Sequence, residues 1–386
     1  MTGAGGVPGT RRVAVVVPKY GLVGGGERFA FELTERLARD ERYEFHVFAN
    51  RWSPGPGKIA YHAVPMIRFP RSLRPLSFAW RAGRMIDRGR FDIVHAHERI
   101  FRADVFTMHA VPHRGWVRAV RRKRESLFDR ATIGLERRMM ANAGASFFLP
   151  VSTIAADALR AEYDVDPGRV RVVHPGVDAA RFAGPDRAAC RAEIRSRHGI
   201  GPSDLLVLFV GMNFEVKGLE QVIAAVGAAR RALPGAGVSL LVVGRGDARK
   251  YAGIAREHGA GDAVAFAGAQ ASGVERYYRA ADLFAMLSAF DTFGMAVLEA
   301  MAAGLPVIVS RNVGAKDLVE DGVNGFVAPA PGDAAAVAAS IVAMADAERR
   351  AAVGAWAHRT AVRRSWDAAA AEVAGVYEAV AKGGSA

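Results

Sequence analysis

Two carboxylates and a glycine form the most specific chemical pattern in the chain. Asp291 and Glu299 lie eight positions apart, and Gly294 between them precedes a run of helix-forming residues, 295–303, that ends at a Gly-x-Pro stop. Carboxylates only accept hydrogen bonds, so two of them along an extended ligand suit recognition of hydroxyl groups. The pattern predicts a loop and then a helix whose N-terminus binds a diphosphate without a metal ion.

A lysine occupies a second loop of the same half. Lys217 lies between an apolar run at 205–210 and a helical pattern at 219–233. A cation at the end of a strand can neutralise the charge that grows on a diphosphate leaving group. We therefore expect Lys217 to be catalytic.

A glycine-rich turn near the start of the chain is a further candidate for anion binding. Gly24, Gly25 and Gly26 follow a strand pattern and open a helical one, so backbone N–H groups and the helix dipole favour an anion there. The turn is no dinucleotide fingerprint, because the last position of G-x-G-x-x-G falls on Phe29. A simple tight turn is the alternative interpretation.

Histidines follow two of the strand-like runs. His109 ends the run 105–109, where it faces a ligand or is merely a hydrogen-bonded histidine at a strand end. His95, His97 and Glu98 form an H-x-H-E cluster with both histidines on one face of a strand. No further ligand cluster supports a closed site, so we expect no metal.

The hydrophobic pattern predicts two α/β domains, each a doubly wound parallel sheet of the Rossmann-like type. Short apolar runs alternate with helical patterns in both halves, which is typical of parallel sheets covered on both faces. The expected active site is a cleft between the domains, where the carboxyl ends of the strands face one another. The expected boundaries are a first domain at 1–182, a linker at 183–204, a second domain at 205–365 and a terminal helix at 366–386 that returns to the first domain. The strand-like runs are at 13–17, 43–49, 92–96, 105–109, 146–152 and 170–173 in the first half, and at 205–210, 240–243, 264–267, 283–287, 307–309 and 325–327 in the second.

The charge of the chain limits its partners. The formal net charge is +13, and arginines concentrate at 68–90 and 114–124. Such a surface attracts anionic lipid headgroups, phosphorylated glycolipids or nucleic acid, although a solvated basic face is the plainer interpretation. The single cysteine, Cys190, suits a reducing compartment, and no stretch reaches membrane-spanning length. We expect a cytoplasmic protein that meets a membrane from outside the bilayer, through a surface of Arg114, Arg118, Arg121, Arg122, Lys123 and Arg124.

The motifs of the second half resemble those of the retaining GT-B glycosyltransferases of family 4. That family carries an acid-x7-acid motif ahead of a Gly-x-Pro turn, and a lysine in the loop corresponding to 211–218. The resemblance implies that Asp291 contacts donor-sugar hydroxyls near the backbone of Phe293, Gly294 and Met295, that Glu299 holds ribose hydroxyls, and that Lys217 binds phosphate. It also implies that His109 touches the donor sugar. Two departures are Asp291 in place of the usual glutamate, and Met212 where an arginine is common.

Within the family, the short first half and residues 128–132 resemble the lipopolysaccharide core glucosyltransferase I branch. The resemblance implies metal-independent transfer of a hexose, with retention, from a UDP-sugar to a phosphorylated glycolipid or polysaccharide at the cytoplasmic face of the inner membrane, with no cofactor. Two other classes stay open from the residues alone. A basic α/β protein that binds nucleic acid would fit the charge, and a nucleotide-cofactor oxidoreductase would fit the fold.

Overall fold

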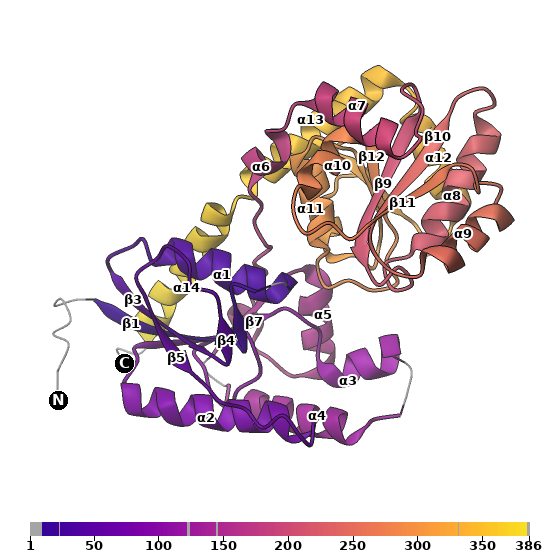
Figure 1. The fold of residues 1–386 in the computed structure, drawn as a ribbon. Coiled ribbons are helices and arrows are strands. Elements are labelled where there is room, and N and C mark those ends of the chain that lie inside the picture. Colours follow the sequence, from indigo (N-terminus) through magenta and orange to yellow (C-terminus); the bar gives the residue numbers. More distant parts are fainter. Residues whose placement is uncertain (1–9, 23, 122–123, 144–145, 331, 384–386) are drawn as a thin grey trace. The chain divides into compact units, whose positions relative to one another are not determined.

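A computed structural model describes residues 10–22, 24–121, 124–143, 146–330 and 332–383. It divides into two compact units (Figure 1). The first comprises Met1–Gly176 together with Trp366–Ala386, and the second comprises Val177–Ser365.

The first unit is built on a six-stranded parallel sheet. Its strands are largely apolar and buried, as expected of a sheet with helices on both faces. The chain runs outward from β1 in both directions, so the strand order reverses between β1 and β6. In order across the sheet, the strands are β5 (Ile59–Ala63), β3 (Tyr43–Ala49), β1 (Arg11–Val16), β6 (Ile93–Ala96), β7 (Val105–Met108) and β8 (Phe147–Pro150), with a small separate pair, β2 (Lys19–Tyr20) and β4 (Arg51–Trp52).

Helices cover both faces of this sheet. Figure 1 shows α1 (Gly25–Leu37) and α14 (Trp366–Gly383) on one face, and α2 (Leu73–Gly89) and α4 (Leu127–Ala141) on the other. Trp366 packs edge-on against Phe29 at 5.7 Å between ring centroids, which anchors α14 to α1. The remaining helical segments are α3 (His113–Trp116), a π-helical turn at Val117–Arg121, α5 (Thr153–Glu162) and a 3-10 turn at Pro167–Arg169.

The second unit repeats the plan. Its six parallel strands reverse their order between β9 and β12. Across the sheet they are β11 (Val264–Gly268), β10 (Val238–Arg245), β9 (Leu205–Met212), β12 (Leu283–Met286), β13 (Val307–Ser310) and β14 (Gly325–Ala328). Its helices are α6 (Ala179–Ala183), α7 (Arg187–Arg197), α8 (Leu219–Ala232), α9 (Ala248–Glu257), α10 (Val274–Ala280), α11 (Met295–Ala302), α12 (Ala334–Ala343) and α13 (Ala347–Arg363), with a 3-10 turn at Gly314–Leu318.

The predicted fold class is confirmed, since both halves form parallel sheets covered by helices. Three details differ from the sequence-based expectation. The run 170–173 forms one isolated bridge, Phe148 to Val170, and no strand. The edge strand β5 was not expected, because the apolar residues of its sequence, Ile-Ala-Tyr-His-Ala, are interrupted by a histidine.

The segment 183–204, expected as a linker, is instead part of the second unit. It contains α7, whose Arg195 is buried and donates to the Asp282 carboxylate at 2.7 Å. The polar composition that indicated a linker therefore reflects an ion pair on a packed helix.

Among the described residues, no helix is both long and apolar enough to cross a membrane.

Candidate functional site

Lys217 and Asp291 lie where the strand order of the second sheet reverses. Lys217 follows β9 and Asp291 follows β12, and these two strands are hydrogen-bonded neighbours. In open α/β sheets the crevice at the carboxyl ends of two such strands is the usual ligand site. The Lys217 ammonium and the Asp291 carboxylate form an ion pair, with 25% and 15% of their side chains exposed. The structure thus brings together two of the predicted site residues.

A glycine allows the Lys217 loop to reach the end of β12. Gly218 has a φ of 75°, and a Cβ atom there would collide with the carbonyl oxygen of Leu287. Few residues other than glycine adopt this conformation without strain. The backbone N–H of Lys217 donates to the Asn213 carbonyl at 3.1 Å, which closes the loop. The position of the lysine is therefore set by backbone geometry.

Helix α11 begins at a second constrained glycine. Gly294 has a φ of +89°, and a Cβ atom there would lie 2.6 Å from Met286 Cε and 2.9 Å from Val313 Cγ1. No side chain caps the helix at Gly294. The Val297 N–H donates to the Gly294 carbonyl at 3.0 Å. The N–H groups before it, including that of Met295, have no carbonyl of their own helix to bond, so they are oriented to receive an anion. Phe293, the preceding residue, is buried at 4% exposure and fills the base of the turn.

A loop that the sequence analysis did not single out holds Asp291 in place. The Asp291 N–H donates to the Asn312 carbonyl at 2.9 Å, and the Gly314 N–H donates to the Asp291 carbonyl at 3.0 Å. The Phe293 N–H also donates to Asp291 Oδ1 at 3.3 Å. A Gly-Ala-Lys sequence four residues after the apolar run 307–309 was the available signal for this loop, since loops at the carboxyl ends of strands line such sites.

Glu299 has a different partner from Asp291. Its Oε2 accepts a hydrogen bond from the Tyr278 hydroxyl at 3.0 Å. Tyr278 is fully buried on α10, whereas Glu299 is partly exposed on α11. The rigid tyrosine therefore fixes the orientation of a carboxylate that remains within reach of a ligand.

Met212 ends β9 with 52% of the residue exposed. Its register partner on β10 is Arg245, which is also exposed. The arginine that is common in the family at position 212 is absent, but Arg245 lies beside that position on the neighbouring strand. The sequence analysis did not select Arg245, because register between strands is a tertiary property that spacing along the chain does not contain.

In the first unit, His97 and His109 lie side by side at the carboxyl ends of β6 and β7. Their rings stack at 5.3 Å, and His97 Nδ1 and His109 Nε2 are 3.0 Å apart in a hydrogen bond. Both histidines line a pocket of about 500 Å³. Other residues around it include Lys19, Gly26, Glu27, Arg71, Arg74, Glu98 and Phe128.

Burial keeps these histidines neutral. It lowers the pKa of His109 to about 4 and that of His95 to about 3, and it lowers the pKa of His97 as well. His95 is hydrogen-bonded to the Tyr377 hydroxyl at 2.8 Å and to Thr107 Oγ1 at 2.7 Å, so it joins α14 to the sheet. Among the described residues, no group of three or more histidine, cysteine, aspartate or glutamate side chains is placed to hold a metal ion.

The glycine-rich turn forms the start of α1. Gly24 is its N-cap residue, and a Cβ atom at Gly24 would collide with the Glu27 carboxylate. A Cβ atom at Gly26 would lie 3.0 Å from His109 Cγ, so the turn packs closely on that ring. Gly25 has open space around it. The Glu27 carboxylate opposes an anion at this turn, a factor that the sequence analysis did not weigh.

The predicted basic surface is only partly available. Arg121 donates to the buried Asp129 carboxylate at 2.6 Å, and Arg114 pairs with Glu162 at 3.8 Å. These two arginines therefore have internal partners, and their role at an acceptor or membrane surface stays a prediction. Arg118 and Arg124 are exposed, while Arg122 and Lys123 lie outside the described residues.

Two family models together match most of the chain. Residues 23–181 match the model described as Glycosyltransferase Family 4, and residues 191–359 match the model described as Glycosyl transferases group 1. This chain belongs to the group 1, family 4 glycosyltransferases. The two alternative classes, a nucleic-acid-binding protein and an oxidoreductase, have no comparable support.

Curated relatives of this glycosyltransferase are named D-inositol 3-phosphate glycosyltransferase. The Segniliparus rotundus protein is 37% identical over 60% of this chain and 52% of its own length. The Actinosynnema mirum protein is 34% identical over 48% of this chain and 45% of its own length, so the chain spans about half the length of these curated relatives. The Thermobispora bispora protein is 28% identical over 93% of this chain and 91% of its own length.

Solved structures share the GT-B fold with this glycosyltransferase. WaaG, a glycosyltransferase involved in lipopolysaccharide biosynthesis, superposes with a TM-score of 0.76 and 21% identity, covering 95% of this chain and 99% of WaaG. Anabaena HepE in complex with UDP and glucose superposes with a TM-score of 0.70 and 18% identity, covering 96% of this chain and 100% of HepE. At these identities the likeness concerns the fold.

Proposed function

We propose that this glycosyltransferase transfers a hexose from a UDP-sugar, with retention of configuration and without a metal ion, to a phosphorylated glycolipid or saccharide. The observation that carries the proposal is the Lys217–Asp291 pair beside the uncapped start of α11. A lysine and helix N–H groups together supply the positive potential that a diphosphate leaving group needs. HepE, which has the same fold, has been solved with UDP and glucose, and this supports a UDP-sugar as the donor.

Different residues of the second unit would each contact a different part of the donor. Lys217 and the α11 start would hold the diphosphate, Asp291 the sugar hydroxyls, and Glu299 the ribose hydroxyls. None of these residues needs to attack the sugar. In the family's mechanism of retention, the acceptor hydroxyl attacks on the leaving-group face and a donor phosphate oxygen assists removal of its proton.

We place the acceptor in the pocket of the first unit. His109, for which the family resemblance implies contact with the donor sugar, is neutral there and can donate to or accept from a sugar hydroxyl, while Glu27 can accept from one. Arg71 and Arg74 are exposed at the same pocket and can bind a phosphate of the acceptor. D-inositol 3-phosphate, named in the relatives, carries such a group. The phosphorylated lipopolysaccharide core implied by the family resemblance carries one as well.

Peripheral contact with an anionic membrane, at the cytoplasmic face of the inner membrane, completes the proposal. Its support is that three residues of the first unit within ten positions of the chain, Arg118, Arg124 and Leu127, are exposed, Leu127 at 74%. Exposed cations beside an apolar side chain favour the interface of an anionic bilayer. The fraction of protein that sediments with phosphatidylglycerol vesicles should fall as the salt concentration rises. Absence of co-sedimentation at low salt would contradict the proposed membrane contact.

A direct transfer assay tests the proposal. Purified protein with EDTA is incubated with UDP-glucose, UDP-galactose or GDP-mannose and with either D-inositol 3-phosphate or phosphorylated lipopolysaccharide core, and products are identified by mass spectrometry. We expect product from a UDP-hexose and one phosphorylated acceptor. The NMR couplings of the product should show that the anomeric configuration of the donor is retained. Product only after metal addition, or with inverted configuration, would overturn the proposed mechanism.

The Arg71→Gln/Arg74→Gln variant tests the acceptor pocket. We expect at least a tenfold rise in KM for the phosphorylated acceptor and little change for a dephosphorylated one, since the variant removes phosphate contacts only. Arg88→Gln, an exposed residue of α2 outside the pocket lining, is the matched control. An equal effect on both acceptors would count against phosphate recognition by these arginines.

A further inference from the structure

A second pocket lies in the second unit, away from Lys217. Its volume is about 490 Å³, and its lining includes Ala303 and Gly304. These residues follow the C-terminal end of α11, whereas Gly294 and the Lys217–Asp291 pair are at its N-terminal end. An eight-residue helix is about 12 Å long, so the two sites are separate.

The lining of this pocket carries surplus positive charge. Arg187 and Arg191 come from α7, Arg279 from α10 and Arg350 from α13. Asp282 is the single acidic side chain among the described residues that line the pocket. Arginine stays charged at all physiological pH values, so one carboxylate faces four permanent cations.

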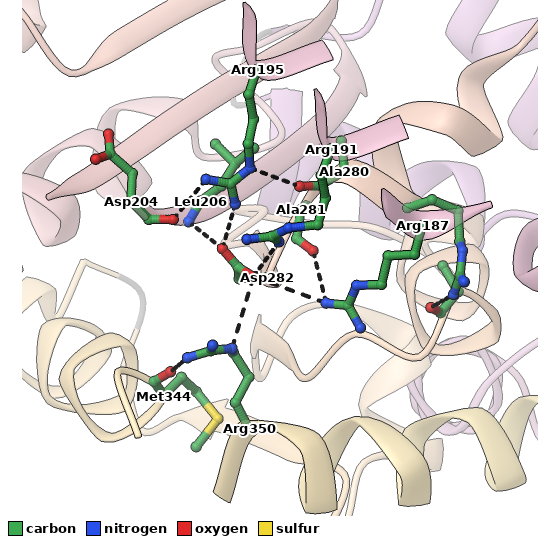
Figure 2. A network of polar contacts seen from close by, with 12 residues as sticks. Arg187, Arg191, Arg195, Asp204, Leu206, Ala280, Ala281, Asp282, Met344 and Arg350 are labelled. Carbon is green, nitrogen blue, oxygen red and sulfur yellow. Dashed lines mark hydrogen bonds and ion pairs between the residues drawn. The ribbon is translucent and has the colours of Figure 1, made fainter. Parts of the chain in front are cut away.

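Asp282 is fully engaged and only 3% of its side chain is exposed. Its Oδ2 accepts from Arg195 Nη2 at 2.7 Å and from the Leu206 N–H at 2.9 Å, and its Oδ1 accepts from Arg191 Nη1 at 2.6 Å. The nearest guanidinium nitrogens of Arg187 and Arg350 are 3.9 Å away (Figure 2). A structural ion pair between α7 and the start of β12 therefore explains Arg195 and Arg191, but not the others.

The other arginines have partners that leave their charge uncompensated. Arg279 donates to the Ala303 carbonyl at 3.2 Å, Arg350 to the Met344 carbonyl at 2.6 Å, and Arg187 to the Ala281 carbonyl at 3.3 Å. These carbonyls are neutral, and each guanidinium carries five N–H donors. Burial, together with repulsion from Arg191, Arg279 and Arg350, lowers the pKa of Arg187. The four arginines that line the pocket therefore exceed its one carboxylate by three positive charges.

We propose that this pocket binds a phosphoryl anion of two or more negative charges, such as a phosphate monoester or a diphosphate, at a site separate from that of the donor. Guanidinium groups bind phosphate through paired, charge-assisted hydrogen bonds, and three elements here present them to one cavity. The anion can come from a free phosphorylated metabolite or from a phospholipid headgroup. Because α7, α10 and α13 meet at the pocket, the bound anion would strengthen their packing in the second unit.

Inorganic pyrophosphate is the probe, at constant ionic strength. The parent protein for the test is Lys217→Ala, so that binding at the donor site is weakened. We expect a rise in Tm of roughly 5 °C or more at a concentration about a hundred times Kd, and a Kd at least tenfold weaker after adding Arg187→Gln/Arg191→Gln. The matched control adds Arg249→Gln/Arg256→Gln on α9, both exposed, and should keep the parental Kd. An equal loss of pyrophosphate affinity after both double substitutions, or no binding of pyrophosphate by the parent protein, would overturn the proposal.

A measurement on the unaltered chain covers the case in which the double variant does not fold. Phenylglyoxal modifies accessible arginines, and mass spectrometry locates the adducts. We expect pyrophosphate to protect Arg187 and Arg191 but not Arg249. Protection by phosphatidic acid vesicles as well would identify a lipid headgroup as a source, protection by pyrophosphate alone would identify a free metabolite, and protection by neither would contradict the proposal.

Discussion

Lys217 and Asp291 form one ion pair although they are 74 positions apart in the chain. Each is partly buried, with 25% of the Lys217 side chain and 15% of the Asp291 side chain exposed. A diphosphate at the start of α11 would compete with Asp291 for the ammonium, and Asp291 would then accept from sugar hydroxyls. The pair therefore holds both groups in position and links binding of the phosphate to binding of the sugar.

Removing the lysine should affect catalysis more than stability. We expect Lys217→Ala to lower kcat by about 100- to 1,000-fold, because the charge that develops on the leaving group loses its main counter-charge. Lys250→Ala, at an exposed lysine of α9, should leave kcat unchanged and serves as the control. Initial-rate kinetics with equal Tm values would establish the effect, whereas near-normal turnover would exclude Lys217 from the mechanism.

Replacing the glycine that begins α11 should destabilise the second unit. At Gly294→Ala the new methyl group meets Met286 and Val313 in a left-handed conformation, with an expected cost of about 2 to 4 kcal/mol. Gly253→Ala in the middle of α9 has free space and should instead stabilise by about 0.5 to 1 kcal/mol. Urea denaturation compares the two variants, and equal stabilities would contradict the assigned backbone constraint.

The second half of the chain was predictable because its strands are continuous apolar runs between clear stops. All six runs expected there are strands, with ends that differ by at most a few residues. The link between Lys217 and Asp291 was not predictable from spacing, because it depends on β9 and β12 being neighbours in the sheet. The loop that bonds Asp291 through Asn312 was missed for the same reason.

Acid should weaken the first unit through its buried histidines. In the unfolded chain histidine takes up a proton near pH 6.5, whereas His109 in the folded unit does so near pH 4. Stability therefore falls as pH drops from about 6.5 towards 4, by up to about 1.4 kcal/mol per pH unit for each such histidine. Hydrogen-exchange protection of β6 and β7 peptides at pH 7 and pH 5 measures the loss.

The variant His109→Asn provides the control for this pH effect. It removes one titrating group, so the decline in protection between pH 7 and pH 5 should be shallower than in the unaltered chain. Protection that does not depend on pH in the unaltered chain would contradict burial of neutral histidines at this edge.

Two arginines of the predicted basic surface should behave differently. Although burial opposes it, hydrogen bonds from Arg121, Ser126 and His113 hold the pKa of Asp129 well below its usual range. Arg121→Gln should cost about 2 kcal/mol, because it weakens the pairing of a buried carboxylate. Arg118→Gln, at an exposed residue, should change stability by less than about 0.5 kcal/mol. Thermal denaturation compares the two variants. Equal changes in stability would contradict a stabilising pair between Arg121 and Asp129.

Charge patterns were the least informative part of the sequence. Arg121 lies in the basic run 114–124 and Arg195 in the segment expected as a linker, yet each is paired with a carboxylate. Asp129 is eight residues from Arg121, and Asp282 is 87 residues from Arg195. Glu27, by contrast, places a carboxylate beside the glycine turn expected to bind an anion. Composition gives the number of charges, while only tertiary structure decides which of them are already neutralised.

Affinity for UDP in the presence of EDTA tests the central claim most directly. Titration calorimetry should show binding by the unaltered protein without a metal ion, and a Kd about 10- to 100-fold weaker for Lys217→Ala, since one charge-assisted contact is lost. Lys250→Ala should match the unaltered protein. Equal affinity of Lys217→Ala, or binding that appears only when a divalent metal is added, would contradict a metal-free diphosphate site at Lys217 and the start of α11.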